Sequence, residues 1–118
     1  MEKYKNYING EFLDSQSGKT FKTINPSSEI EFAEVAEAEE FEVNLAVESA
    51  SKAFHGEWST FLPKNRAKYL RAIGDQLLEN AEKLGTIETK DTGKLFKETK
   101  FQANYIACLL YTSDAADE

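Results

Sequence analysis

The sequence predicts an α+β fold, in which a small antiparallel β unit is followed by about four helices. The main observation is a change in the spacing of apolar residues. They alternate with polar residues in the first third of the chain, and from about Glu40 they recur with a period of about 3.6. A second observation is an Asn-Gly pair near the start, a strong short-range signal for a β-hairpin. Neither an internal repeat nor a clear linker divides the 118 residues.

The β unit begins with this hairpin. Asn9-Gly10 lies between two pairs of apolar residues, and both turn residues tolerate the positive φ that a type I′ turn requires. A turn around Gly18 precedes a strand that carries Phe21 and Ile24. Pro26 ends this strand because it has no amide hydrogen to donate to a ladder. A further strand is predicted in "EIEFAEVAEA", where the alternation slips midway and leaves the pairing register open.

Four helices are predicted in the rest of the chain. The first covers "EEFEVNLAVESASKAF", and a loop with the only tryptophan follows it. The second extends from about Lys64 to Asn80, the third is closed by Gly93 in a left-handed C-cap, and the fourth begins near Leu95. The apolar stripe of the first helix consists of Val43, Ala46, Val47, Ala50, Ala53 and Phe54. The residues of the second helix that are expected to face inward are Ala67, Leu70, Ile73, Leu77 and Leu78.

Composition excludes several classes of function. The net charge of −7 disfavours both nucleic acid and an anionic membrane surface as partners. No apolar run approaches the roughly 20 residues of a membrane span, and the start lacks the apolar core of a secretory signal. A single cysteine cannot form an internal disulfide, so we expect a cytoplasmic protein. No CxxC or HExxH motif is present.

The remaining candidates for chemistry are isolated. His55 lies beside Gly56 without an orienting partner nearby in the sequence, which disfavours a general base. "GTIETKDTGK" fails as a phosphate loop, because Glu88 replaces the first glycine and Leu95 follows Lys94. A basic set could bind anions but is best explained as a solvated helix face: Lys64, Arg66, Lys68 and Arg71. An acidic run could bind cations but is likewise best explained as a solvated surface: Glu29, Glu31, Glu34, Glu37, Glu39, Glu40 and Glu42.

Several segments, taken in order, resemble the beginning of an NAD(P)-dependent aldehyde dehydrogenase. These are "YINGEF", "TFKTINPSS", "LAVESASKAF" with the downstream Trp58, "YLRAIGDQLLENAEKLGTIETKDTGKL" with Arg66 before it, and "NYIA". The resemblance covers about residues 4 to 107. It implies the N-terminal strand-and-helix layer, residues 1–107, of the cofactor-binding domain of an α/β, Rossmann-like fold.

The resemblance also implies the activity of a longer parent enzyme. Members of the family oxidise an aldehyde to a carboxylic acid: a cysteine thiolate forms a thiohemiacetal, hydride passes to NAD or NADP, and a glutamate activates the hydrolytic water. These groups lie later in the family's chain, so no catalytic or cofactor-binding residue is expected here. The parent is expected to be a homo-oligomer that acts on a small-molecule aldehyde.

One site is carried over from the family. Members of the betaine-aldehyde type hold a monovalent cation, K⁺ or Na⁺, with backbone carbonyls of the Thr-Ile in "TINP" and with the Asp of "DTGK". The matching residues here are Thr23, Ile24 and Asp91. Oxygen ligands suit a hard cation. The alternative is that Asp91 only accepts backbone hydrogen bonds at the turn that ends its helix.

The last eleven residues depart from the family pattern. "CLLYTSDAADE", residues 108–118, resembles the translation of an adapter used in preparing sequencing libraries, and we interpret it as a non-native tail. Cys108, a possible nucleophile by residue type, also comes far too early to match the family's nucleophile. The alternative to the enzyme fragment is a stand-alone α+β module that binds a protein partner, and that module should unfold cooperatively by itself.

Overall fold

The computed structural model describes the backbone of residues 1–115 and the side chains of residues 1–112. Residues 116–118, the end of the suspected tail, lie outside the described part. The chain divides into two units, Met1–Thr60 and Phe61–Glu118, and each is described by itself.

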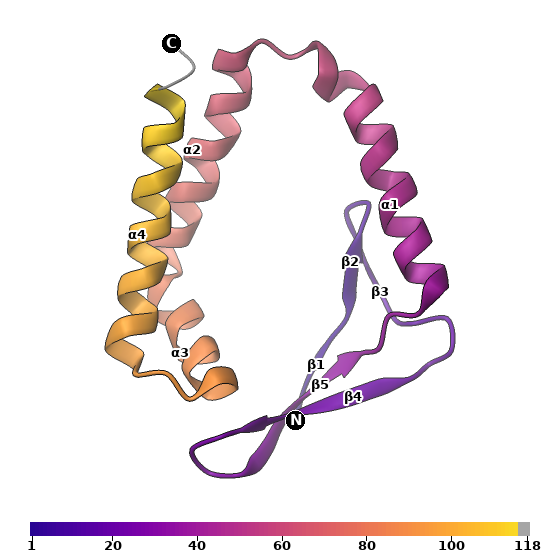
Figure 1. Cartoon of the computed structure of the whole chain (residues 1–118), viewed down its shortest axis with the longest axis vertical. Coiled ribbons are helices and arrows are strands. Elements are labelled where there is room, and N and C mark those ends of the chain that lie inside the picture. Colours follow the sequence, from indigo (N-terminus) through magenta and orange to yellow (C-terminus); the bar gives the residue numbers. More distant parts are fainter. Residues whose placement is uncertain (116–118) are drawn as a thin grey trace. The chain divides into compact units, whose positions relative to one another are not determined.

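The first unit contains five strands, one α-helix and one 3₁₀ helix (Figure 1). Their bounds are β1 (Glu2–Tyr4), β2 (Asn6–Ile8), β3 (Glu11–Leu13), β4 (Thr20–Asn25), β5 (Ile30–Ala36), α1 (Glu40–His55) and η1 (Glu57–Thr60). Strands β2 and β3 form the predicted hairpin, and Asn9 and Gly10 have the positive φ angles of 53° and 80° expected for its turn. The hairpin contacts α1 through β2.

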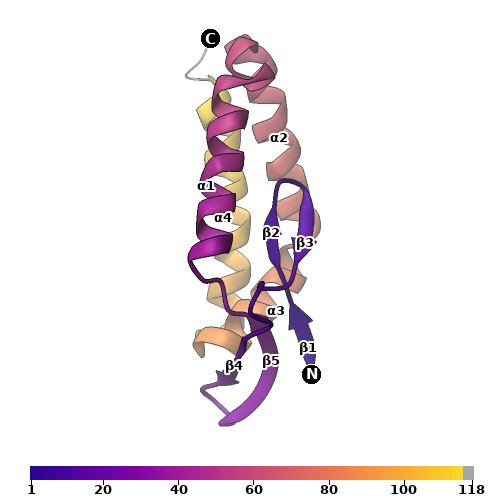
Figure 2. The same cartoon turned by 90° about the vertical axis from the view of Figure 1, so that its right-hand side faces the viewer.

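The other three strands form one sheet in the order β1-β5-β4, seen at the bottom of Figure 2. Strands β4 and β5 are antiparallel, and their register shifts between Thr23 and Ile24, where Ala33 and Glu31 are the successive partners. This shift explains the slipped alternation in the β5 sequence, because a bulge moves the side chains that follow it to the other face. The pairing of β1 with β5 is parallel, so the β unit is not antiparallel throughout as expected.

The second unit contains the other three α-helices: α2 (Pro63–Glu79), α3 (Ala81–Thr92) and α4 (Phe96–Ala115). Helix α4 contacts both α2 and α3, and it runs antiparallel to α2 (Figure 1). The order of strands followed by four α-helices confirms the predicted fold class. Gly93 has a φ of 74° and ends α3 in the predicted left-handed conformation.

The buried residues of both units are mostly small. Apart from Ile8, every buried apolar residue among the described ones is an alanine: Ala33, Ala36, Ala67, Ala81, Ala103 and Ala107. Because small residues line the helix contacts, α4 approaches its two neighbours closely, and Gly74 and Gly85 lie in the same contacts.

The prediction of which helix residues face inward is correct only in part. Ala67 is buried and Leu70 and Leu77 are half-buried, whereas Ile73 and Leu78 are 51% and 42% exposed. The apolar stripe of α1 is also exposed at Val43, Val47 and Phe54. An apolar stripe on a helix is wider than the contact that one neighbouring element makes. Periodicity therefore marks the whole stripe but not which part of it is covered within this chain.

Candidate functional site

The first two residues of the predicted cation site lie on β4. This strand is at the edge of its sheet, so part of its backbone N–H and C=O groups point away from β5. Thr23 is half-buried, Ile24 is 52% exposed, and the register shift separates them in the ladder. Both residues are nevertheless paired with β5, Thr23 with Ala33 and Ile24 with Glu31.

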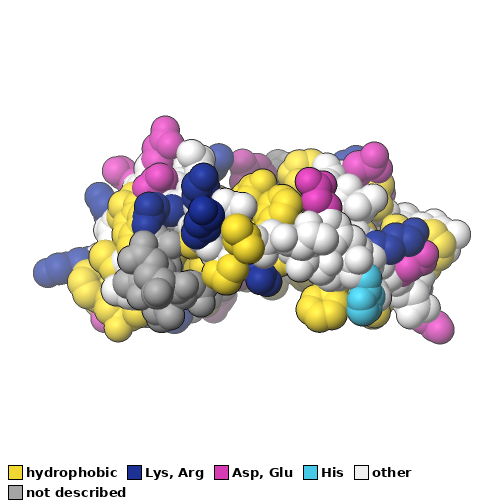
Figure 3. Space-filling view, turned by 90° about the horizontal axis from the view of Figure 1, so that it is seen from above, with side chains coloured by type: hydrophobic (Ala, Val, Ile, Leu, Met, Phe, Trp, Pro, Cys, Tyr) yellow, Lys and Arg dark blue, Asp and Glu magenta, His cyan; other side chains and the backbone are white. Residues whose placement is uncertain are grey.

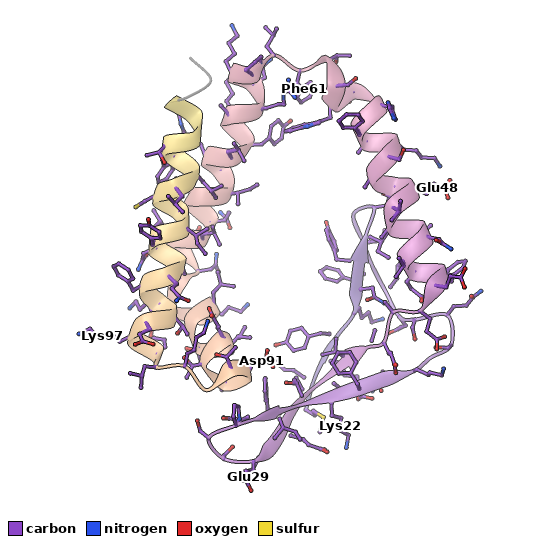
Figure 4. All side chains as sticks on the ribbon, in the orientation of Figure 1. Lys22, Glu29, Glu48, Phe61, Asp91 and Lys97 are labelled. Atoms are coloured by element: carbon purple, nitrogen blue, oxygen red, sulfur yellow. The ribbon has the colours of Figure 1, made fainter. Side chains whose placement is uncertain are left out.

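The third residue, Asp91, is exposed in the last turn of α3, where Figure 4 labels it. The amide of Gly93 donates a 2.9 Å hydrogen bond to the carbonyl of Thr89, which closes the helix after Asp91. The hydroxyl of Thr92 donates to the carbonyl of Glu88, and Lys94 forms a 3.0 Å ion pair with the Glu88 carboxylate. The Asp-Thr-Gly-Lys corner is therefore fixed by hydrogen bonds around Gly93.

Thr23 and Ile24 belong to the first unit and Asp91 to the second. Within the described residues, no three His, Cys, Asp or Glu side chains are grouped as metal ligands. The predicted set consists of two carbonyls and one carboxylate. Such a set suits a cation of single charge and hard character.

The two isolated candidates lie at the surface. His55 is the last residue of α1 rather than a loop residue, and its ring packs edge-on against Phe54 with the centroids 5.0 Å apart. Figure 3 shows it at the surface beside apolar side chains. Cys108 is exposed on α4, and the helix continues through Ala107 and Cys108 without a break.

The charged sets behave differently from one another. On α2, Lys64, Lys68 and Arg71 are exposed and Arg66 is half-buried, which agrees with a mainly solvated face. In the acidic run, three carboxylates form ion pairs across the β unit: Glu31 with Lys22, Glu34 with Lys3, and Glu39 with Lys19. The acidic run is therefore partly structural.

Sequence reasoning missed Glu42, which was grouped with the solvated carboxylates. This residue is buried, with 3% of its surface exposed, and accepts hydrogen bonds from two backbone amides. The signal was present, because a glutamate at the third position of a helix often bonds back to the amide of the N-cap residue. Here Glu39 is the N-cap of α1 and Glu42 is that third position.

Comparison with known proteins identifies the family. A sequence model described as the aldehyde dehydrogenase family matches residues 12–118, which is most of the chain. The chain belongs to the aldehyde dehydrogenase family. This confirms the resemblance inferred from the ordered segments.

Individual aldehyde dehydrogenases agree with this assignment. Aldehyde dehydrogenase 1 of Tanacetum cinerariifolium is 45% identical over 85% of this chain, and an aldehyde dehydrogenase of Davidiella tassiana is 39% identical over 95%. Among solved structures, betaine aldehyde dehydrogenase from Staphylococcus aureus in complex with NAD⁺ superposes with a TM-score of 0.91 at 33% identity. That match covers 97% of this chain and 23% of the Staphylococcus chain.

The chain spans about a fifth of the length of the curated aldehyde dehydrogenases that it matches, 20% and 23% for the two relatives above. It also covers 23% of an NAD-dependent aldehyde dehydrogenase structure from Sinorhizobium meliloti, with a TM-score of 0.90 at 26% identity. Within the described residues, no helix combines the length and hydrophobicity needed to cross a membrane.

Proposed function

We propose that this chain is the N-terminal part of an NAD(P)-dependent aldehyde dehydrogenase that oxidises a small-molecule aldehyde to a carboxylic acid. The observation that supports the proposal is that nearly the whole chain is similar to a segment of its relatives, and that this segment is only about a fifth of their length. Residues 1–107 would be the strand-and-helix layer of the cofactor-binding domain. The full-length parent would be a cytoplasmic homo-oligomer.

The residues of this chain do not fit a dinucleotide. A dinucleotide-binding fold places a glycine-rich turn and a helix N-terminus around the pyrophosphate, directly after a strand. Among the described residues, the one junction between a strand and an α-helix lies between β5 and α1. It carries Glu37, Glu39, Glu40 and Glu42 and no glycine, so its carboxylates would repel a pyrophosphate. We therefore assign neither catalytic nor cofactor-binding residues to this chain.

The activity is tested on two proteins. The 118-residue chain, mixed with an aldehyde and NAD⁺ or NADP⁺, is expected to generate no reduced cofactor above the blank. The protein from the corresponding longer gene is expected to generate it. Turnover by the 118-residue chain would contradict the proposal that the catalytic groups lie elsewhere, and an inactive longer protein across a panel of aldehydes would contradict the enzyme assignment.

We further propose that in the parent Thr23 and Ile24 supply backbone carbonyls and Asp91 a carboxylate to a monovalent cation. The edge position of β4 and the exposed Asp91 support this assignment. K⁺ is expected to raise the melting temperature of the parent, and Asp91→Asn is expected to remove most of that increase. Glu82→Gln, on the exposed side of the same helix, is the control and should retain it. An equal K⁺ effect in wild type and Asp91→Asn would exclude Asp91 as a ligand.

We also propose that residues 108–118 are a non-native tail, because of their resemblance to a translated sequencing adapter. The match to the family model extends to residue 118 and speaks against this proposal. Independent sequencing of the source DNA tests this directly. A native continuation of several hundred residues in place of "CLLYTSDAADE" is expected. A stop codon directly after this tail in independent reads would instead favour the alternative, a small binding module, and that module would also unfold in one cooperative transition.

A further inference from the structure

Glu42 connects two segments that are far apart in the sequence. One carboxylate oxygen, Oε1, accepts a 2.6 Å hydrogen bond from the amide of Gln16, which lies 26 residues earlier in the loop between β3 and β4. The other, Oε2, accepts a 2.9 Å hydrogen bond from the amide of Glu39 at the N-cap of α1. Among the residues whose exposure is described, Glu42 is the one buried ionisable side chain. Its charge is thus held by backbone amides in place of water.

The loop that carries Gln16 is itself ordered by hydrogen bonds. The amide of Gly18 donates to the carbonyl of Ser15 at 2.9 Å, and the buried hydroxyl of Ser15 donates to the carbonyl of Lys19 at 3.0 Å. The same Lys19 carbonyl accepts the amide of Glu37, which lies just after β5. The loop can therefore move as one piece once its attachments to α1 are released.

Three side-chain attachments hold this loop at the start of α1, and they differ in strength. The Glu39 carboxylate interacts with both Lys19 and Ser17, and the Glu42 carboxylate accepts the amide of Gln16. The ion pair between Lys19 and Glu39 is exposed, with 61% and 42% of the side-chain surfaces accessible. Exposed pairs of this kind contribute little because water and salt screen them. The bonds to Glu42 are buried and charge-assisted, and such bonds are about twice as strong as neutral ones. Of these side-chain attachments, the one to Glu42 is buried.

We propose that Glu42 is an acid-sensitive latch: its ionised carboxylate holds the β3–β4 loop against the first turn of α1, and protonation releases both. A neutral carboxyl group is a weaker acceptor for two amides than a carboxylate, because the charge that strengthens both hydrogen bonds is lost. The charged side chains around the latch are Asp14, which is paired with Lys5, and Lys19 on the loop, with Glu37, Glu39 and Glu40 on the side of α1.

The direction of the pH dependence follows from the same contacts. The hydrogen bond from Gln16, then that from Glu39, lowers the pKa of Glu42 below its ordinary value of 4.5, although burial opposes this. A group whose pKa is lowered by folding stabilises the fold above its unfolded pKa, and this contribution is lost as pH falls through the folded pKa. The latch is therefore closed at neutral pH, and it opens as the pH falls through the lowered pKa of Glu42.

The test is amide hydrogen exchange and NMR titration of the whole 118-residue chain. Glu42→Gln keeps the size of the side chain and removes the charge, so it should speed exchange at the Gln16 and Glu39 amides by about ten-fold or more. Glu40→Gln, an exposed change two residues away, is the control and should leave both rates unchanged. In wild type, the two amide signals should titrate together with a midpoint below 4.5.

Each outcome decides the proposal. Unchanged exchange at Gln16 in Glu42→Gln would overturn it, as would Gln16 and Glu39 signals in wild type that titrate with different midpoints. If Glu42→Gln does not fold, the wild-type titration still decides, because a latch requires a shared midpoint. The inference does not depend on the proposed enzyme function, since it concerns only the contacts within the first unit.

Discussion

The hydroxyl of Thr99 on α4 donates a 2.9 Å hydrogen bond to the carbonyl oxygen of Gly85 on α3. Thr99 is completely buried, and its hydroxyl also lies 3.0 Å from both the carbonyl of Phe96 and the hydroxyl of Thr89. Because one hydroxyl has one proton, Thr99 donates to one carbonyl at a time and accepts the proton of Thr89. This small polar group fixes α3 against α4 in the second unit, where large apolar side chains remain at the surface.

Thr99→Val should destabilise the chain by about 1–3 kcal/mol, the usual cost of leaving buried polar groups without a partner. Valine has nearly the shape of threonine, so the loss reports the hydroxyl and not a cavity. Thr86→Val is the matched control, since Thr86 is exposed on α3 and its hydroxyl bonds only to the carbonyl of Glu82 in the same helix. Urea unfolding measures both variants. Equal midpoints for the two would show that the Thr99 hydroxyl contributes nothing specific.

Gly85→Ala should also destabilise, although alanine is the better helix former by about 1 kcal/mol. A Cβ at Gly85 would lie 2.9 Å from the backbone nitrogen and 3.1 Å from the Cα of Lys100, so the two helices would have to separate. Overpacking of this kind costs about 1–3 kcal/mol.

Gly74→Ala provides the comparison, because a Cβ there would meet the ring of Tyr111 at 3.2 Å, and a side chain can move aside more easily than backbone. Its unfolding free energy should therefore change less than that of Gly85→Ala, or increase. A larger loss for Gly74→Ala in urea unfolding would contradict this assignment of the tight contact to the α3–α4 pair.

Local signals made most of the fold predictable from the sequence. The turn at Asn9-Gly10, the end of β4 before Pro26 and the left-handed cap at Gly93 each depend on residues that restrict their own backbone. The parallel pairing of β1 with β5 was not predictable in the same way, because its partners are about 31 residues apart and no turn residue specifies it.

The site residues were less predictable for a related reason. Thr23, Ile24 and Asp91 were predicted from the resemblance of this chain to the aldehyde dehydrogenase family, and no local pattern joins residues that lie in two different units. Glu42 was missed because seven glutamates between residues 29 and 42 look alike in a solvated run. Its position in the capping box was a local signal, but its burial and the long-range hydrogen bond from Gln16 are not contained in a local pattern.

Gly10→Ala should weaken the β2–β3 hairpin without affecting any packing contact. Gly10 has a φ of 80° and nothing lies within 4 Å of an added Cβ, so the cost is that of the left-handed backbone, about 1–2 kcal/mol. Gly10→Asn should cost less, because asparagine adopts this conformation more readily. The paired Tyr7 and Phe12 rings, with centroids 4.8 Å apart, report hairpin formation through their NMR shifts. Identical shifts in all three proteins would contradict the assignment of backbone strain to this turn.

Glu34 should make the three-stranded sheet sensitive to acid, because its carboxylate contacts both neighbouring strands. It accepts a 2.6 Å hydrogen bond from the hydroxyl of Thr20 on β4 and lies 3.5 Å from the ammonium of Lys3 on β1. The hydrogen bond from Thr20, followed by the charge of Lys3, lowers the pKa of Glu34 from its ordinary value of 4.5.

A lowered carboxylate pKa stabilises the fold above the unfolded value of 4.5 and ceases to do so as pH falls below the folded value. Glu34→Gln should therefore be less stable than wild type at pH 7 and should lose less stability than wild type when the pH is lowered to about 3. Glu31→Gln is the control, since Glu31 forms an ion pair with the exposed Lys22 on β4 and so contacts one neighbouring strand in place of two. Urea midpoints are measured for each protein at both pH values. If acid lowers the stability of Glu34→Gln as much as that of wild type, protonation of Glu34 does not cause the acid sensitivity of the sheet.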